Sequence, residues 1–328
     1  MQLLVRQFAS SHSTADKGTL RDCLFTSLPM ILEVVALYRF VPLNGLASLR
    51  ADLLRLCRAH GLRGTILLAR EGINGTVAGP SSGIVALLSA LDGICGIAQG
   101  EVKHSQASEW PFNRMKVRIR EEIITLRAPE ADPSRQAGTY VAPAEWNALI
   151  DAEDVLVLDT RNRYETKVGT FEGALDPGID SFTAFKDFVE TRLDPAVHRK
   201  VAMFCTGGIR CEKASSYMLS KGFESVFHLK GGILKYLEEV SPQDSRWNGE
   251  CYVFDKRVAV GHGLKPGTWI ACHGCGAPLD EAEARSGAYE AGVSCPYCIN
   301  GLTEARARDL RQRHAAFVAG TAVPDVEG

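Results

Sequence analysis

Residues 201–211 read Val-Ala-Met-Phe-Cys-Thr-Gly-Gly-Ile-Arg-Cys, so that an apolar run leads into a cysteine, a glycine pair and an arginine. This pattern predicts a buried strand, a tight loop that starts at Cys205, and a helix from about Glu212. The N–H groups of such a loop turn inward and, with the helix N-terminus, form a site for an anion. Because these N–H groups and the cation of Arg210 stabilise a thiolate, the sequence predicts that Cys205 is a reactive cysteine.

The length of this loop indicates which kind of cysteine chemistry it supports. Between the cysteine and the arginine lie four residues, Thr206, Gly207, Gly208 and Ile209. Cysteine phosphatases use a loop that is one residue longer, which suits a phosphate. The shorter loop resembles the active-site loop of rhodaneses, which carry sulfur on the cysteine as a persulfide. The structural alternative is a buried cysteine at a strand end, packed as a small hydrophobic side chain.

The composition is typical of a globular protein with more than one domain. The chain has 328 residues, 45% of them hydrophobic, and a formal net charge of −2, so any RNA-binding surface must be local. We expect no membrane association, because no apolar run reaches the length of a membrane span. Two Cys-x2-Cys pairs account for four of the ten cysteines, and we identify no signal peptide. We therefore expect a cytoplasmic protein whose thiols bind metal or take part in catalysis.

The first part of the chain is predicted to form a small sheet domain. Residues 1–30 show no sustained pattern, and we expect a disordered extension with Met30 as a candidate start of translation. Residues 31–127 alternate in the order strand, helix, strand, strand, helix, strand, which is the βαββαβ order of a ferredoxin-like domain. Residues 70–75 are predicted to be the turn before its third strand, because Asn-Gly is a strong turn signal.

A basic stripe follows in the same domain. Arg114, Lys116, Arg118 and Arg120 alternate with apolar residues, so on a strand all four side chains would point to one face. Aromatic residues precede the stripe, and the combination suits contact with an RNA backbone. A solvated strand face without a ligand is the alternative.

The second domain is predicted to be of the α/β class. Residues 128–139 contain two prolines and few apolar residues, which is typical of a linker. Residues 140–242 alternate strands and helices, which predicts a parallel sheet with helices on both faces. Asp159, Arg161 and Glu165 follow a buried strand at the edge where ligands bind in such sheets. These three side chains can pair and support the cysteine loop, or they can form a purely structural ion-pair cluster.

Residues 243–302 are predicted to form a cysteine-rich module. Its two Cys-x2-Cys pairs, nineteen residues apart, are formed by Cys272, Cys275, Cys295 and Cys298. This spacing suits a structural zinc site of the zinc-ribbon type, since four cysteine thiolates close a tetrahedral shell. Two unrelated pairs of free or redox-active thiols are the alternative. Residues 303–328 are predicted to be an arginine-rich helix and a disordered tail.

Several motifs together resemble a known family. The motifs at 159–165, 171–174, 205–214 and 229–233 look like those of a rhodanese domain. Residues 70–76 and 247–255, with the two Cys-x2-Cys pairs, narrow the resemblance to the bacterial oxygen-dependent tRNA uridine hydroxylases. Members of this family carry a rhodanese domain and form 5-hydroxyuridine at the wobble position. The resemblance covers about residues 31–300, and the motifs occur in the family's order.

The resemblance implies a tRNA-modifying oxidoreductase of the EC 1.14 class. It implies that Cys205 is essential, that Cys211 is a second important thiol, that the anticodon loop of a tRNA is the substrate, and that molecular oxygen is a co-substrate. We identify no flavin or nicotinamide motif and no two-His-one-carboxylate iron site in the sequence. No obligate protein partner is expected.

The residues by themselves leave three functions open: a persulfide-carrying sulfurtransferase, the tRNA hydroxylase, and an RNA-binding module without catalysis. The additional domains favour a tRNA enzyme, because an anticodon loop needs a large surface to hold it. One hypothesis is that Cys205 adds to C6 of uracil and makes C5 electron-rich, while Arg210 and the loop N–H groups stabilise the charge. In another, Cys211 resolves an oxidised Cys205 through a disulfide.

Overall fold

The computed structural model describes residues 31–319. The extension expected at residues 1–30, with Met30, and the end of the tail, residues 320–328, lie outside the described residues. Within the described part, no helix combines the length and the apolar character that crossing a membrane requires.

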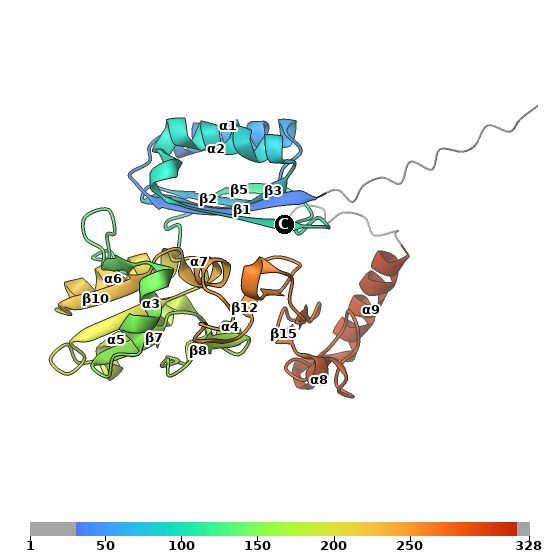
Figure 1. Ribbon diagram of the computed structural model, residues 1–328. Helices are drawn as coiled ribbons and strands as arrows, with labels where there is room; N and C mark the ends of the chain where they lie inside the picture. Colours follow the sequence, from blue (N-terminus) through green and yellow to red (C-terminus); the bar gives the residue numbers. More distant parts are fainter. Residues whose placement is uncertain (1–30, 320–328) are drawn as a thin grey trace, which may run out of the picture. The chain divides into compact units, whose positions relative to one another are not determined.

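The described chain begins with a five-stranded sheet that carries two helices on one face (Figure 1). Its strands are β1 (Leu32–Phe40), β2 (Arg63–Ala69), β3 (Gly72–Gly79), β4 (Glu101–Ala107) and β5 (Met115–Ile119), in the order β4-β1-β3-β2-β5. The helices are α1 (Leu46–Ala59) and α2 (Ser81–Cys95). Inward-facing residues such as Val35, Ile66 and Val77 form one buried cluster with apolar residues of both helices. The βαββαβ order is thus confirmed, and β5 extends the sheet as a strand parallel to β2.

The turn between β2 and β3 is shorter than predicted. Arg70 and Glu71 form it, whereas Asn74 and Gly75 lie inside β3, so the assignment of Asn-Gly to the turn was wrong. Gly75 is required instead by the close packing of β3 against β2. A Cβ at this position would lie 2.7 Å from the carbonyl oxygen of Thr65 on the neighbouring strand.

The central part is a four-stranded parallel sheet in the order β6-β10-β9-β7. Its strands are β6 (Thr139–Val141), β7 (Val155–Asp159), β9 (Lys200–Phe204) and β10 (Ser225–Leu229), and its helices are α3 (Pro143–Ile150), α5 (Phe185–Arg192), α6 (Ile209–Ser220) and α7 (Gly232–Glu239). Val201 and Met203 of β9 pack with residues of α5 and α6, while Ala202 and Phe204 pack with residues of α3 and α7. Helices therefore cover both faces of the sheet, as the sequence predicts.

The segment 128–139 packs against this central part. Ala128 and Ala131 are buried in the same cluster as the residues of α5 and α6. The N–H of Gly138 donates to Oγ of Ser215 on α6 at 2.8 Å. The connection between the two sheets is therefore held on the surface of the second one.

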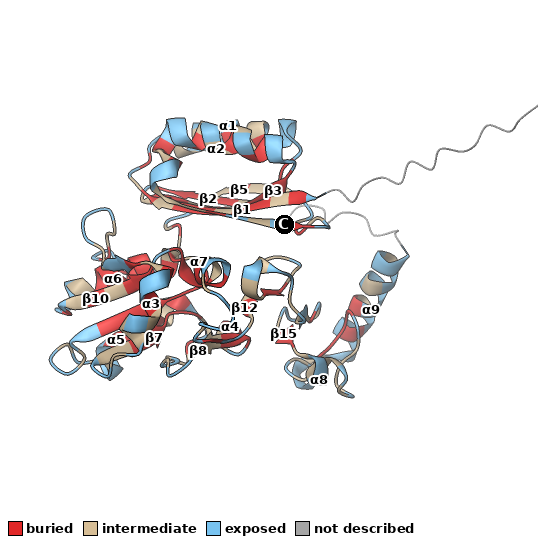
Figure 2. Cartoon of the chain, in the orientation of Figure 1, coloured by how far each residue is buried: buried red, intermediate tan, exposed pale blue. Residues whose placement is uncertain are grey.

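The remaining elements are mostly short, and they come from two parts of the chain. These are α4 (Arg163–Thr166) and β8 (Gly169–Phe171), which precede α5, and then β11 (Trp247–Gly249), β12 (Cys251–Tyr252), β13 (Ala259–Val260), β14 (Ile270–Ala271), β15 (Pro278–Leu279), α8 (Glu281–Ala284) and α9 (Glu304–Val318). Strand β11 pairs with β8, β12 with β13, and β14 with β15. Helix α9 buries Ala307 and Leu310 against Val293, and most of its remaining surface is exposed (Figure 2).

Candidate active site

The cysteine loop lies between the end of β9 and the start of α6. Helix α6 begins at Ile209, three residues earlier than predicted, so the loop comprises only residues 205–208. Gly208 has a φ of 99°, a backbone conformation that favours glycine, and its N–H donates to Sγ of Cys205 at 3.1 Å. The loop thus directs an N–H group at the sulfur, as an anion site requires.

The N-terminus of helix α7 is hydrogen-bonded to the backbone of the loop. The N–H groups of Ile233 and Leu234 donate to the carbonyl oxygens of Cys205 at 2.9 Å and of Thr206 at 3.1 Å. A Cβ on Gly232 would lie 2.5 Å from the Cys205 carbonyl oxygen, so only glycine allows this approach. The helix N-terminus therefore fixes the loop backbone, and the loop N–H groups remain available to the thiolate.

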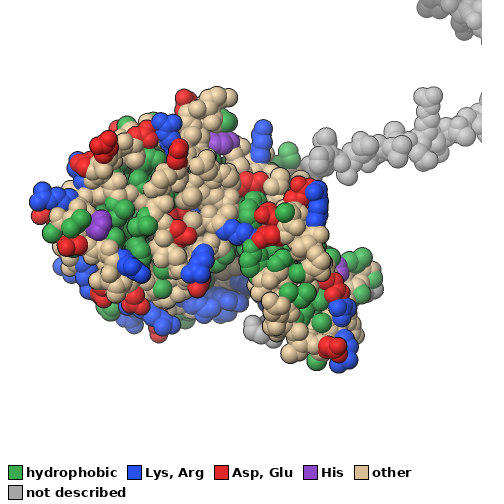
Figure 3. All heavy atoms as spheres, turned by 90° about the horizontal axis from the view of Figure 1, so that it is seen from below, with side chains coloured by type: hydrophobic (Ala, Val, Ile, Leu, Met, Phe, Trp, Pro, Cys, Tyr) green, Lys and Arg blue, Asp and Glu red, His purple; other side chains and the backbone are tan. Residues whose placement is uncertain are grey.

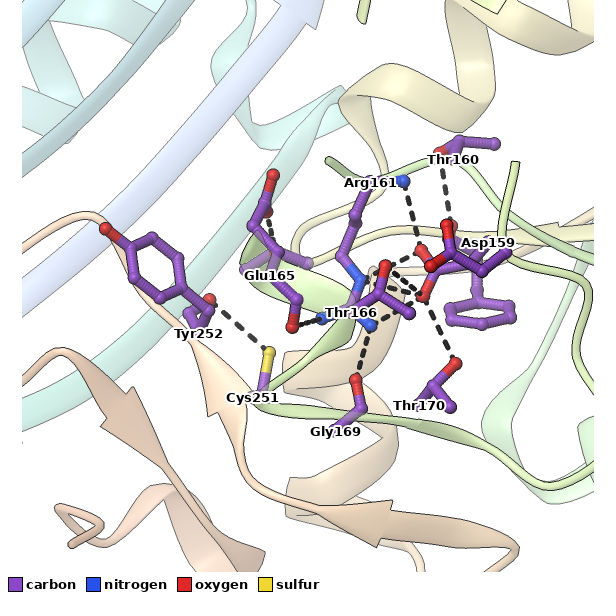
Figure 4. Close-up of polar contacts among 12 residues, drawn as sticks. Asp159, Thr160, Arg161, Glu165, Thr166, Gly169, Thr170, Cys251 and Tyr252 are labelled. Carbon is purple, nitrogen blue, oxygen red and sulfur yellow. Dashed lines mark hydrogen bonds and ion pairs between the residues drawn. The ribbon is translucent and has the colours of Figure 1, made fainter. Parts of the chain in front are cut away.

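Cys205 is the acidic member of a pair of neighbouring thiols. Burial raises its pKa, but the hydrogen bond from Cys211, the charge of Arg210 and the backbone N–H groups outweigh burial and lower the pKa to about 5. Burial and the interaction with Cys205 raise the pKa of Cys211 well above its usual value. Burial raises the pKa of Cys251, whose Sγ contacts the carbonyl oxygen of Tyr252, to about 12 (Figure 4). At neutral pH, the thiolate form of Cys205 is therefore favoured beside the protonated thiol of Cys211.

Glu165 holds the loop arginine. Arg210 donates through Nη1 and Nη2 to the two carboxylate oxygens of Glu165, each at 2.6 Å, and both side chains are buried. Burial raises the pKa of Glu165, but the charge and hydrogen bonds of Arg210 outweigh this and lower it. The ion pair orients the guanidinium beside Cys205.

Asp159 and Arg161 form a separate ion pair. Nε and Nη2 of Arg161 donate to the Asp159 carboxylate at 2.9 and 2.6 Å, and Nη2 also donates to the carbonyl oxygen of Gly169 at 2.6 Å (Figure 4). Both side chains are fully buried. The three predicted supporting residues thus fall into two groups: Glu165 contacts the cysteine loop through Arg210, whereas the other two brace the backbone around α4 and β8.

A cavity of about 300 Å³ lies in front of Cys205. The loop contributes Cys205 and Thr206 to its walls, and the first turn of α6 contributes Arg210. The open face of the first sheet contributes Tyr38, Asn74, Thr76 and Lys103, and the segment after β12 contributes Phe254, Asp255 and Arg257. Cys205 itself is only 1% exposed. A reactant therefore meets this thiol inside a space enclosed by the first sheet, the cysteine loop and the segment after β12.

Two side chains of α6 connect the cysteine loop to the first sheet. Lys213, whose side chain is 2% exposed, donates through Nζ to Glu71 at 2.8 Å and to Glu122 at 3.0 Å. The hydroxyl of Tyr38 donates to Glu212 at 2.9 Å. The helix that starts at the cysteine loop is therefore fixed to the other domain.

Sequence reasoning missed these connecting residues and Lys103. Except for Glu122, which follows β5, each belongs to a strand, turn or helix that the sequence pattern identifies. Nothing in the pattern says which residues of the two domains meet. One signal was present, because Glu71 belongs to the motif at residues 70–76 that supports the family resemblance.

The basic stripe lies at the edge of the first sheet. Lys116 and Arg118 belong to β5, while Arg114 and Arg120 flank it. Val117 packs into the core with α1 and α2, so the two cations inside the strand point to the opposite, open face. On the face shown in Figure 3, basic and acidic side chains are interspersed.

One row of residues crosses the open face from the stripe to the cavity. In register across the five strands lie Lys116, Thr65, Thr76, Ala36 and Lys103. The last three line the cavity. Because neighbouring strands are about 4.8 Å apart, the four steps of this row span roughly 19 Å.

The four cysteines of the last module converge. Their sulfur atoms all lie within 4.8 Å of one another, with Cys275 and Cys295 at 3.6 Å. Four thiolates around a tetrahedral zinc ion would be about 3.8 Å apart, given Zn–S bonds of about 2.3 Å. The cluster predicted from the spacing is therefore present and can hold a metal ion such as zinc.

Comparisons with known proteins agree with this architecture. A family model described as "UPF0176 acylphosphatase like domain" matches residues 32–123, and one described as "Rhodanese-like domain" matches residues 142–239. They confirm the ferredoxin-like and rhodanese-like predictions.

Whole-chain relatives carry a more specific name. A protein of Mesorhizobium japonicum named "tRNA uridine(34) hydroxylase" is 54% identical over 284 residues, which cover 87% of this chain and 91% of the relative. A protein of Brucella anthropi with the same name is 53% identical over 276 residues, covering 84% and 90% of the two chains. With this identity over more than four fifths of its length, the chain belongs to the tRNA uridine(34) hydroxylase family.

Proposed function

We propose that this chain hydroxylates C5 of the wobble uridine of tRNA, with molecular oxygen as co-substrate, and that Cys205 is the catalytic cysteine. The observation that carries the proposal is the cavity in which an acidic thiol faces the open side of an RNA-compatible sheet. Relatives that match most of the chain bear the name of this activity. An unpaired base of an anticodon loop can turn out of its stack into such a cavity.

The thiolate is suited to activate the base. When Sγ of Cys205 adds to C6 of uracil, the Sγ–C6 bond forms and the C5=C6 π bond breaks. The electron pair moves onto C5 and the conjugated oxygen O4, so that C5 can attack the oxidant. Arg210 and the loop N–H groups stabilise the negative charge of the thiolate before it adds and after it leaves.

Cys211 can help to supply the electrons that the reaction with oxygen requires. Placing one oxygen atom of O2 on C5 and releasing the other as water consumes two electrons and two protons. When, after the addition is reversed, the Cys205 thiolate and the Cys211 thiol form a disulfide, they supply both electrons and one proton, and the solvent supplies the second proton. A dithiol reductant then reduces the disulfide. We propose Cys211 as this resolving thiol, because its Sγ–H donates to Cys205.

The remaining predictions follow from the same function. The basic strand would contact the phosphates of the anticodon loop through Arg114, Lys116, Arg118 and Arg120. Zinc held by Cys272, Cys275, Cys295 and Cys298 would stabilise the last module without taking part in the chemistry. A tRNA-modifying enzyme with reduced thiols would act in the cytoplasm.

A persulfide-carrying sulfurtransferase is the second candidate. The observation that favours it is the four-residue spacing between Cys205 and Arg210 in a domain that matches the rhodanese-like model. Its product would be a thiolated uridine or a sulfur transfer to a small acceptor.

The test is mass spectrometry of nucleosides from U34-containing tRNA incubated in air with the full-length chain and a dithiol. The proposal expects 5-hydroxyuridine from the wild type, none from Cys205→Ser, and wild-type amounts from the control Cys95→Ser. Cys95 lies on α2, and a serine hydroxyl can keep its contact with the Leu91 carbonyl oxygen. Thiolated uridine instead of 5-hydroxyuridine would support the sulfurtransferase, and full activity of Cys205→Ser would contradict both functions.

A further inference from the structure

A buried lysine of the first domain faces the cysteine loop across the cavity. Lys103 lies on β4, is only 8% exposed, and lines the same cavity as Cys205. Its Nζ donates to Glu101 at 3.1 Å and lies 5.5 Å from the centre of the Tyr38 ring. The sheet thus places an ammonium group in the wall opposite the thiolate.

The other arginine and lysine groups in the described cavity wall are already engaged. Both Nη atoms of Arg210 are bound by Glu165, and Nε and Nη2 of Arg257 are bound by Asp255. The ammonium of Lys103 has three N–H donors, of which one is directed at Glu101. Two donors therefore remain for a ligand in the cavity.

Burial of the charged Lys103 ammonium group costs desolvation free energy. Desolvation lowers the pKa of Lys103, while the carboxylate of Glu101 and the negative charge of Cys205 act in the opposite direction. An ion pair between lysine and glutamate could stabilise the strand equally well at the surface, where it would not have to be desolvated. Lys103 lies at the cavity end of the row of residues that begins at Lys116. If the phosphates of an RNA contact the edge strand at Lys116, this row leads from them to a base beside Lys103.

We propose that Lys103 is a further catalytic residue, which donates a hydrogen bond to O4 of the wobble uracil while Cys205 adds to C6. This inference rests on the proposed function. As the Sγ–C6 bond forms and the C5=C6 π bond breaks, the electron pair is delocalised over C5 and O4. A cation at O4 stabilises this charge where it develops, and protonation of C5 followed by loss of the C5 proton and of the thiolate restores uracil.

This step can be measured without the oxidant. In D2O and without oxygen, each reversible addition exchanges the hydrogen at C5 of uridine 34 for deuterium, which mass spectrometry of the nucleoside detects. We would measure this exchange, and hydroxylation in air at saturating tRNA, for the full-length wild type and for Lys103→Met. The matched control is Lys200→Met, which also removes a lysine with one carboxylate partner, Asp154, but at the end of β9 remote from the loop.

The proposal expects Lys103→Met to lose both rates by about 100-fold or more, as removal of one donor to a developing oxyanion does. The tRNA dissociation constant and the Lys200→Met rates should stay at wild-type values. If Lys103→Met does not fold, the pair Glu101→Gln/Lys103→Met, which leaves no unpaired carboxylate, replaces it.

Wild-type exchange and hydroxylation in a folded Lys103 variant would overturn the role of Lys103 and leave the proposed function intact. Hydroxylation by the wild type without C5 exchange would overturn the addition step and this inference with it. A wild type that forms no 5-hydroxyuridine would contradict the proposed function itself.

Discussion

The guanidinium of Arg210 and the carboxylate of Glu165 meet through two parallel hydrogen bonds of 2.6 Å. Arg210 follows β9 and Glu165 follows β7, and these are neighbouring parallel strands. The carboxyl ends of parallel strands share one edge, so residues 45 positions apart meet beside the thiolate. The geometry of the thiolate site therefore depends on a pair that only the parallel order brings together.

Replacing either member of this pair alone should be costly. Glu165→Gln leaves a buried guanidinium without its counter-ion, and we expect a loss of about 3–5 kcal/mol in the free energy of unfolding. The double variant Glu165→Gln/Arg210→Met should lose less than the sum of the two single changes. Denaturant unfolding of the four proteins measures this difference, and additive losses would mean that the pair contributes no interaction energy.

Arg210→Lys tests the geometry and keeps the charge. Lysine cannot form two parallel hydrogen bonds to a carboxylate, so we expect hydroxylation to fall by about 10–100-fold with little change in tRNA affinity. Single-turnover rates and binding titrations separate these effects. A wild-type rate would show that the charge of residue 210 suffices.

The acidity of Cys205 predicts the pH dependence of its reactivity. With a pKa of about 5, its alkylation by iodoacetamide should rise to half its plateau near pH 5, well below an ordinary cysteine. Peptide mapping by mass spectrometry distinguishes Cys205 from Cys211, whose raised pKa should keep it unreactive at neutral pH. A half-point near pH 8 would contradict the thiolate assignment.

The same shift predicts how stability varies with pH. The thiol has a lower pKa in the folded chain than in the unfolded chain, where it is about 8.5, so between pH 5 and 8.5 the unfolded state binds more protons. Its contribution is complete above pH 8.5 and is lost as the pH falls through 5. Cys205→Ser should remove up to about 1.4 kcal/mol per pH unit from the slope of unfolding free energy in that window. An unchanged slope would contradict the depressed pKa.

The four-cysteine cluster predicts one zinc ion per chain. Elemental analysis should find this stoichiometry, and Cys295→Ser should lose the metal and lower the unfolding temperature. The control Cys95→Ser, outside the cluster, should keep both. Because we propose a structural role for the metal, we expect the alkylation rate of Cys205 in folded Cys295→Ser to match that of the wild type. Loss of Cys205 reactivity together with zinc would assign the metal to the reaction.

The contact of Lys213 with the first domain predicts an effect on Cys205. Lys213→Met leaves Glu71 and Glu122 without their shared cation, and we expect a loss of about 3 kcal/mol in unfolding free energy and faster alkylation of Cys205. Lys221→Met is the matched control, since Lys221, the residue directly after α6, also bridges two carboxylates, those of Glu130 and Glu190, but at the surface. It should change the alkylation rate much less, and equal effects would argue against a role of the domain contact.

The edge strand predicts a change in the salt dependence of binding. Lys116→Met and Arg118→Met should each weaken tRNA binding and lower the slope of log affinity against log salt by about 1. Arg55→Gln removes an exposed cation of α1 as a control, and its slope should equal that of the wild type. Unaltered slopes in the two β5 variants would remove this strand from the RNA interface.

Local features of the sequence predict much of this site. The run from Val201 to Cys211 identifies the loop because strand, glycine pair and arginine are adjacent, and the Cys-x2-Cys spacing identifies the cluster for the same reason. Asn74-Gly75 was assigned to the wrong place because glycine is favoured both in tight turns and where two strands approach closely, and the sequence does not distinguish the two cases. Lys103 could not be found, because a lysine on a strand is ordinarily solvated and only the packing of the two domains buries it.

The attachment of α6 to the first sheet also bears on how the chain is made. Domains generally fold in the order in which the ribosome delivers them, so the sheet with Glu71 exists before Lys213 has been synthesised. Arg210 and the remaining groups that make Cys205 acidic arrive later than the sheet that encloses it. In the newly made protein, the groups that make the thiolate reactive therefore follow the first sheet, and Phe254, Asp255 and Arg257, which complete the cavity wall, follow later still.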